Sequence, residues 1–211
     1  MSGLVLEGVV ARRGRFQVGP LSAEIPCGQL LWLAGANGSG KSTLLSVIAG
    51  LLRLAAGRVL FQDQVLTSAG SWVPPWQRPC SILLQDLGLW PHLSIRRQST
   101  LVVQQKRSQK YPVEPRLEML ASSLQVVGLL DRQPSQLSGG EAQRCALLRA
   151  LMPEAPLLLL DEPYSDQHPE GVACIDDVIQ EQLAAGSVIL LAGHRAPAGA
   201  NKVELDRELS G

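Results

Sequence analysis

The sequence predicts an α/β fold in which a mostly parallel sheet carries helices on both faces. Two short apolar runs, at 30–34 and 157–160, each end in a turn rich in polar residues or glycine, a pattern typical of strands buried on both faces. Strands that alternate with helices along a chain form a parallel sheet with right-handed crossovers. The length of 211 residues is that of one domain, which we expect to span 1–211.

The remaining strands are expected where short apolar runs are bounded by glycine, proline or charged residues. In chain order these runs are 4–11, 58–62, 81–84, 187–192 and 201–206. The segment 69–79 contains three prolines and is expected to be a loop.

Helices are expected at 41–50, 138–152 and 171–185. Gly50 stands near the end of the first helix, where glycine commonly terminates helices. Five apolar residues recur at helical spacing farther along the chain: Leu117, Leu120, Ala121, Leu124 and Val127. This spacing predicts a helical sub-lobe at about 88–150.

The composition excludes several functions. Lys plus Arg and Asp plus Glu are both 19, a formal net charge of +0, whereas a non-specific nucleic-acid binder needs a basic excess. The four cysteines form no C-x-x-C pair, which argues against a zinc site and fits a reducing compartment. No apolar run approaches the roughly 18 residues of a membrane span, and the N-terminus has no signal-peptide pattern. We therefore expect a soluble protein that is not exported by a cleavable signal.

A glycine-rich segment between the strand at 30–34 and the following helix fits the pattern G-x-x-x-x-G-K-[ST]. Its residues are Gly35, Ala36, Asn37, Gly38, Ser39, Gly40, Lys41, Ser42 and Thr43. Backbone N–H groups of such a loop, with the positive end of the helix, bind phosphates. Lys41 is placed to reach the β- and γ-phosphates and Ser42 to ligate Mg²⁺. The motif predicts nucleotide binding but does not choose among kinases, GTPases and ATPases.

A second motif makes that choice. The segment Leu137-Ser138-Gly139-Gly140-Glu141 resembles the signature of ATP-binding cassette (ABC) proteins, and the resemblance continues through Gln143, Arg144, Arg149 and Ala150. Ser138, Gly139 and Gly140 stand at a predicted helix N-terminus, which makes a second anion site. Taken alone, Ser138 and Glu141 also form a capping box.

Three further segments resemble the family's motifs. The run at 157–163 resembles Walker B, so that Asp161 would hold Mg²⁺ and Glu162 would orient or deprotonate the attacking water. Gln85 resembles the Q-loop glutamine, which contacts Mg²⁺ and senses the γ-phosphate, and the Pro-His-Leu-Ser run at 91–94 is common in transport cassettes. His194 resembles the switch histidine.

The residue that stacks on adenine is left open. Phe16 stands where the family often has such an aromatic side chain. Arg13 or Arg15 are alternatives, as is simple packing of Phe16 in an N-terminal sheet.

The resemblance covers about 4–206. It implies a P-loop NTPase with a small N-terminal antiparallel β lobe and a helical sub-lobe that carries the signature. It further implies an ATPase that forms a head-to-tail homodimer or heterodimer around two ATP and drives transmembrane permease subunits. Such a subunit would be cytoplasmic and peripheral on the inner face of the membrane, without nucleic acid. The alternatives are a soluble ABC ATPase of the repair or translation type and a small-molecule kinase, which would not explain 137–141.

The segment after Walker B, the D-loop at 163–168, departs from the family pattern. Gln167 and His168 stand where Leu and Asp are usual. Since the D-loop links the two sites of a dimer and histidine titrates near neutral pH, slowed or pH-sensitive hydrolysis is expected.

Overall fold

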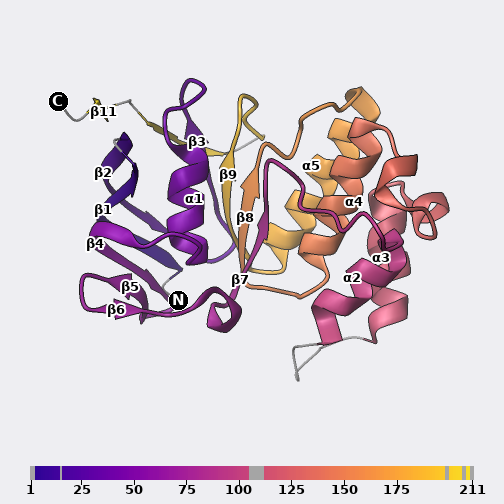
Figure 1. The fold of residues 1–211 in the computed structure, drawn as a ribbon, viewed down its shortest axis with the longest axis horizontal. Coiled ribbons are helices and arrows are strands. Elements are labelled where there is room, and N and C mark those ends of the chain that lie inside the picture. The colour runs from indigo at the N-terminus through magenta and orange to yellow at the C-terminus, as the bar shows by residue number, and fades with distance from the viewer. Residues whose placement is uncertain (1–2, 15, 105–111, 198–199, 206–207, 210–211) are drawn as a thin grey trace.

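The computed structural model describes residues 3–14, 16–104, 112–197, 200–205 and 208–209. Figure 1 shows an antiparallel sheet, helix α1, a parallel sheet and a group of helices side by side along the long axis of the molecule. The strands are β1 (Leu4–Arg13), β2 (Phe16–Ile25), β3 (Leu30–Ala34), β4 (Leu54–Phe61), β5 (Gln64–Ser68), β6 (Ser71–Trp72), β7 (Cys80–Leu83), β8 (Leu157–Asp161), β9 (Val188–Ala192), β10 (Asn201–Glu204) and β11 (Glu208–Leu209). The α-helices are α1 (Lys41–Ala49), α2 (Ile95–Gln104), α3 (Val113–Ser123), α4 (Gly139–Leu151) and α5 (Pro169–Ala184).

The parallel sheet confirms the predicted fold class. Among the described residues its strand order is β10-β3-β9-β8-β7, and every neighbouring pair is parallel. The leucines of β8 alternate between two apolar cores, with Leu157 and Leu159 on the side of α1 and Leu158 and Leu160 on the side of the other helices. All five residues of β8 are buried, as expected for a strand covered on both faces.

The second sheet is antiparallel, has the order β11-β2-β1-β4-β5-β6 among the described residues, and packs against α1. Strands β2 and β5 were not predicted. In β2 partly exposed residues interrupt the buried ones, and the Gly19-Pro20 pair lies within the strand, so no apolar run marks it. The segment 69–79 is not wholly a loop, because it contains β6, which pairs with the preceding strand β5.

Several predicted ends differ from the structure. Strand β4 starts at Leu54 and ends at Phe61, since Gln62 has a φ of 49° and turns the chain. Strand β7 lies one residue before the predicted 81–84. Strand β10 ends at Glu204, and Asp206 lies outside the described residues.

Helix α1 carries at its N-terminus the glycine-rich segment 35–43, which the sequence predicts to bind phosphate and which we call the phosphate-binding segment. The helix is held firmly at its other end. Gly50 terminates it in the left-handed conformation at φ 81°. The buried guanidinium of Arg78 donates to the carbonyls of Val47 (3.1 Å) and Ile48 (2.7 Å) in the last turn of the helix. The Val47 carbonyl also accepts from the N–H of Gly50 (3.0 Å). Gly50 and Arg78 therefore fix the C-terminal end of α1.

The predicted helical sub-lobe is present. Helices α2 and α3 pack on one another and on α4, and α4 packs on the edge strand β7. In the described part of the chain, no helix combines the length and the apolar character needed to cross a membrane.

Candidate functional site

The phosphate-binding segment follows β3 and bends through glycines that no other residue could replace without strain. Gly40, at φ 100°, precedes α1, and a Cβ there would lie 2.7 Å from Cβ of Val18. A Cβ on Gly35, at φ 143°, would lie 2.7 Å from the carbonyl oxygen of Leu205. The glycines therefore permit a close approach of the loop to both sheets, as a backbone cradle for phosphate requires.

The side chain of Lys41 is buried inside this loop. Its Nζ donates to the carbonyls of Gly35 (2.7 Å) and Ala36 (3.0 Å). A buried ammonium held by carbonyl dipoles favours an anion nearby, because an anion neutralises its charge.

Asp161 ends β8 with a carboxylate that the protein leaves incompletely satisfied. The residue is 3% exposed, and its Oδ1 is buried without a hydrogen-bond partner among the described residues. Burial raises the pKa of Asp161, although a hydrogen bond with Ser42 opposes that shift. A divalent cation beside Asp161 and Ser42 would satisfy this oxygen.

The residues present fit Mg²⁺ rather than a metal held by protein alone. The described residues contain no group of three or more His, Cys, Asp or Glu that could hold an ion. Mg²⁺ is usually bound by one or two protein oxygens together with water and substrate phosphates, which matches Asp161 and Ser42 beside the phosphate loop.

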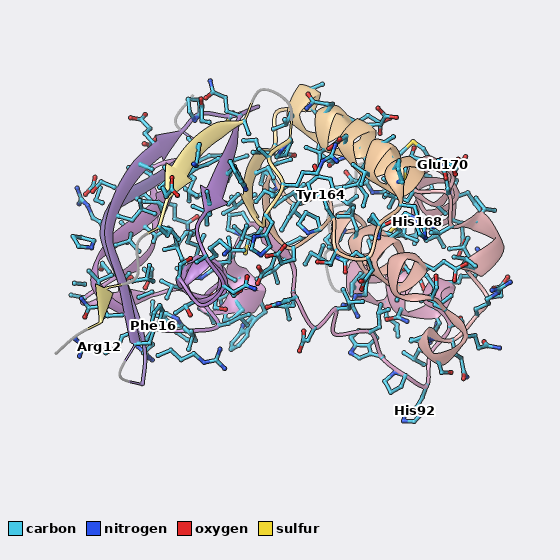
Figure 2. All side chains as sticks on the ribbon, turned by 90° about the horizontal axis from the view of Figure 1, so that it is seen from above. Arg12, Phe16, His92, Tyr164, His168 and Glu170 are labelled. Carbon is cyan, nitrogen blue, oxygen red and sulfur yellow. The ribbon has the colours of Figure 1, made fainter. Side chains whose placement is uncertain are left out.

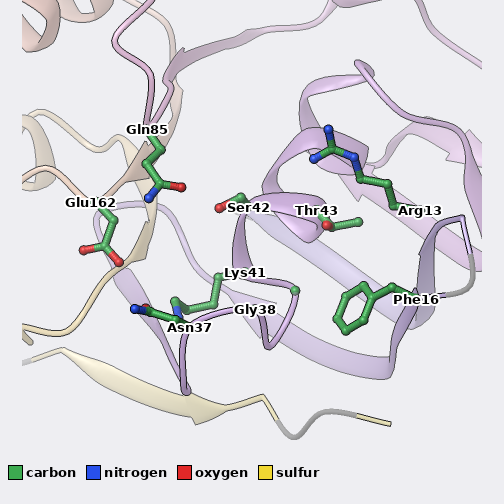
Figure 3. A pocket seen from close by; sticks show the side chains of 10 residues that line it. Arg13, Phe16, Asn37, Gly38, Lys41, Ser42, Thr43, Gln85 and Glu162 are labelled. Carbon is green, nitrogen blue, oxygen red and sulfur yellow. The ribbon is translucent and has the colours of Figure 1, made fainter. Parts of the chain in front are cut away.

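One cavity of about 570 Å³ joins most of these groups (Figure 3). It is lined by Arg13, Phe16, Asn37, Gly38, Gly40, Lys41, Ser42, Thr43, Gln85 and Glu162. Figure 3 shows Gln85 and Glu162 at one end, the phosphate-binding segment in the middle, and Arg13 and Phe16 at the other end. The aromatic ring of Phe16, the phosphate-binding segment and the carboxylate of Glu162 thus line one cavity in that order. Arg15 lies outside the described residues.

Glu162 and His194 approach one another from neighbouring strand ends. The N–H of Glu162 donates to the carbonyl of Ala192 (2.8 Å), which ties the two loops together. Nε2 of His194 lies 3.8 Å from Oε1 of Glu162 and 2.8 Å from Oδ1 of Asn37. The side chain of His194 is 62% exposed, so it stands at the mouth of the site rather than inside it.

Two contacts behind this pair were not predicted. The indole N–H of Trp32 donates to the carbonyl of Gly193 (2.9 Å), and Nε2 of Gln143 donates to the carbonyl of Glu162 (2.9 Å). Trp32 is 161 positions from Gly193, so no local pattern in the sequence could reveal the contact.

The signature segment lies elsewhere. Ser138 caps α4 and exchanges hydrogen bonds with Glu141, and these bonds lower the pKa of Glu141. A separate cavity of about 650 Å³ is lined by Ser138, Gly139, Gly140, Glu141, Arg144, Asp166 and His168. Figure 2 shows Phe16 and His168 on opposite halves of the molecule. They are separated along the long axis, which is horizontal in both Figure 1 and Figure 2. One chain therefore does not bring Ser138, Gly139 and Gly140 to its own phosphate-binding segment.

The unusual D-loop residues have defined places. The amide of Gln167 accepts from Arg144 (2.8 Å) and donates to the carbonyl of Gly140 (3.0 Å), which joins the D-loop to α4. Gly140 must be glycine here, since a Cβ would lie 2.6 Å from the carbonyl oxygen of Asp166. His168 is exposed and directly precedes α5.

Comparisons with known proteins agree with this geometry. The family model described as ABC transporter matches residues 18–165. The chain is 34% identical over 200 residues to the thiamine import ATP-binding protein ThiQ of Ruegeria sp. (strain TM1040), covering 95% of this chain and 84% of that protein. It is 40% identical over 201 residues to the molybdenum import ATP-binding protein ModC of Mycobacterium tuberculosis (strain ATCC 25618 / H37Rv), covering 92% of this chain but 53% of ModC. A solved ATP-binding subunit of an ABC transporter shares the fold, with a TM-score of 0.79 at 24% identity over 90% of this chain and 79% of that one.

Proposed function

This chain belongs to the ABC transporter family, as an ATP-binding subunit that hydrolyses ATP, and we propose that two such subunits enclose two ATP to drive a transmembrane permease. One observation carries the proposal. A single cavity contains the phosphate-binding segment, Gln85 and Glu162, whereas the signature segment faces a different cavity on the other half of the molecule. In a dimer of identical or homologous cassettes, the signature segment of each cassette would close the ATP site of the other.

In the proposed site each end of ATP meets a different part of the chain. Phe16 stacks on adenine, while Arg13 lines the same end of the cavity. The phosphates lie against the backbone N–H groups of 35–43, and the ammonium of Lys41 turns from its own carbonyls to the β- and γ-phosphates. Ser138, Gly139 and Gly140 of the second cassette contact the γ-phosphate.

Mg²⁺ fits beside Ser42, Asp161 and Gln85, and when bound it neutralises charge on the phosphate oxygens. The residues of the chain then prepare the water. Glu162 accepts its proton or orients it, and His194, 3.8 Å from Glu162, holds the water and the γ-phosphate in line. Gln85 senses whether the γ-phosphate is present.

The segment after Gln85 is the proposed docking surface for the permease. Trp90 is 41% exposed, and the guanidinium of Arg149 lies 5.5 Å from the centre of its ring. Arg149 also donates to the carbonyls of Leu87 (2.7 Å) and Gly88 (2.6 Å). Arg149 belongs to the signature helix α4, so its contacts connect the segment that carries Trp90 to that helix. A docking surface connected in this way could transmit movement between the permease and α4.

We further propose that the subunit is cytoplasmic and lies on the inner face of the cell membrane. We also propose that it works in import, since the names of the two curated relatives described above include import. The sub-lobe at 88–150 acts as part of a single ATPase domain, since α4 packs on β7 of the parallel sheet. We propose that the membrane partner selects the cargo. A repair or translation role is not favoured by the import relatives.

The test is Glu162→Gln in the full chain with ATP and Mg²⁺. The expected result is a dimer on gel filtration and hydrolysis reduced to background, because ATP is bound across the interface but not cleaved. Glu170→Gln, an exposed carboxylate on α5, is the matched control and should behave as the wild type. A Glu162→Gln variant that stays monomeric and hydrolyses ATP would contradict the proposal.

A further inference from the structure

A tyrosine in the D-loop is bound to the helix that follows it. The hydroxyl of Tyr164 donates to Oδ1 of Asp176, in α5, at 2.5 Å. This is the length of a hydrogen bond between a hydroxyl and a charged carboxylate, which is about twice as strong as a neutral one. Burial, together with the adjacent Asp176, raises the pKa of Tyr164, so the phenol stays protonated and remains a donor.

The other oxygen of the same carboxylate holds a second loop. Nη2 of Arg195 lies 3.5 Å from Oδ2 of Asp176. The guanidinium of Arg195 also lies 5.6 Å from the centre of the Tyr164 ring, within the range of a cation–π contact. Tyr164, Asp176 and Arg195 thus contact one another pairwise, and we call this group the Asp176 clasp.

The two loops held by the clasp are the loops that carry the proposed catalytic pair. Tyr164 is two residues after Glu162, and Arg195 directly follows His194. The side chains of Glu162 and His194 are themselves 3.8 Å apart. One carboxylate on the 16-residue helix α5 therefore contacts both loops.

We propose that Asp176 is a positioning residue for ATP hydrolysis, holding the D-loop and the switch loop at the separation that keeps Glu162 and His194 on the same water. This inference rests on the proposed function. The ion pair itself is partly exposed and contributes little to stability, so the effect is expected in the chemical step rather than in folding.

The first experiment compares Asp176→Ala with Asp177→Ala in the full chain. The two residues are neighbours on α5 and undergo the same change, but Asp177 is exposed. Asp176→Ala should lower kcat by about 5- to 20-fold and leave KM for ATP within about twofold, since the phosphate-binding segment is untouched. Asp177→Ala should match the wild type in both constants.

The second experiment separates a shared clasp from two unrelated contacts. Tyr164→Phe retains the ring and removes only the hydroxyl, and Arg195→Ala removes the second contact. If both act through Asp176, the double variant should lose roughly as much kcat as the more damaged single variant, rather than the product of the two losses.

The outcomes distinguish this inference from the function on which it rests. A wild-type chain that does not hydrolyse ATP would refute the proposed function. A wild type that hydrolyses ATP, with Asp176→Ala equal to Asp177→Ala, would leave that function standing and overturn the clasp. The clasp would equally be overturned if KM rose with kcat unchanged, or if the losses in Tyr164→Phe and Arg195→Ala multiplied.

Discussion

Asp161 is expected to lower the stability of the protein when no nucleotide is bound, and Asp161→Asn should therefore stabilise it. The carboxylate is 3% exposed, has one oxygen without a partner among the described residues, and ends a strand buried on both faces. An amide of the same shape has no charge to bury. We expect the free energy of unfolding of Asp161→Asn to exceed that of the wild type by about 1–2 kcal/mol at neutral pH, a size typical of single stabilising substitutions.

For a chain of this length, that gain corresponds to an increase in Tm of about 2–8 °C. Its pH dependence follows from the direction of the shift. The pKa of Asp161 is raised in the folded state, so as pH rises from about 4 the unfolded chain releases the proton first and the wild type loses stability. The advantage of Asp161→Asn should be complete at neutral pH and shrink as the pH falls towards about 4.

Thermal unfolding with and without Mg²⁺ and ATP measures both halves of the argument. At 100 times its dissociation constant, a ligand stabilises the folded state by about 2.7 kcal/mol, so the wild type should overtake the variant when both ligands are added. The variant should gain no more from ATP with Mg²⁺ than from ATP with chelator. Asp177→Asn, on an exposed face of α5, is the control. A variant less stable than the wild type at neutral pH, or an advantage independent of pH, would refute the reasoning.

Two other substitutions test the loops around the site. Gly40→Ala should destabilise the chain by about 1–3 kcal/mol and weaken ATP binding at least tenfold, because φ is 100° and Cβ would meet Val18 at 2.7 Å. Gly70→Ala, in open space, should do neither, and equal Tm values for the two variants would argue against this strain. His168→Asp, which restores the residue usual in the family, should hydrolyse ATP faster, and a rate identical to that of the wild type would rule out a role for His168.

The parallel sheet was predictable because its strands carry their own signal. β3 and β8 are buried on both faces, so every residue in them is apolar until the strand ends. The antiparallel sheet was harder to predict. One face of β2 is exposed and the strand contains Gly19 and Pro20, so its course depends on pairing with β1 rather than on its own composition.

The candidate site divides in the same way. The phosphate-binding segment, Asp161 and the signature segment were recognisable because their chemistry needs particular residues at fixed, short spacing. The contacts that hold these segments have no such spacing. Trp32 reaches Gly193 across 161 positions, and Asp176 gathers residues from two loops that meet only because β8 and β9 are neighbours.

The sequence by itself determined the ligand class and the strands of the parallel core, since backbone N–H groups, a lysine and a carboxylate bind phosphate and metal wherever they occur together. Only the tertiary structure decided which groups share a cavity. It joins Gln85 and Glu162 to the phosphate-binding segment and directs Ser138 to another cavity. The physical reason is the parallel sheet, which brings strand ends far apart in sequence to one edge and leaves the start of α4 beyond it.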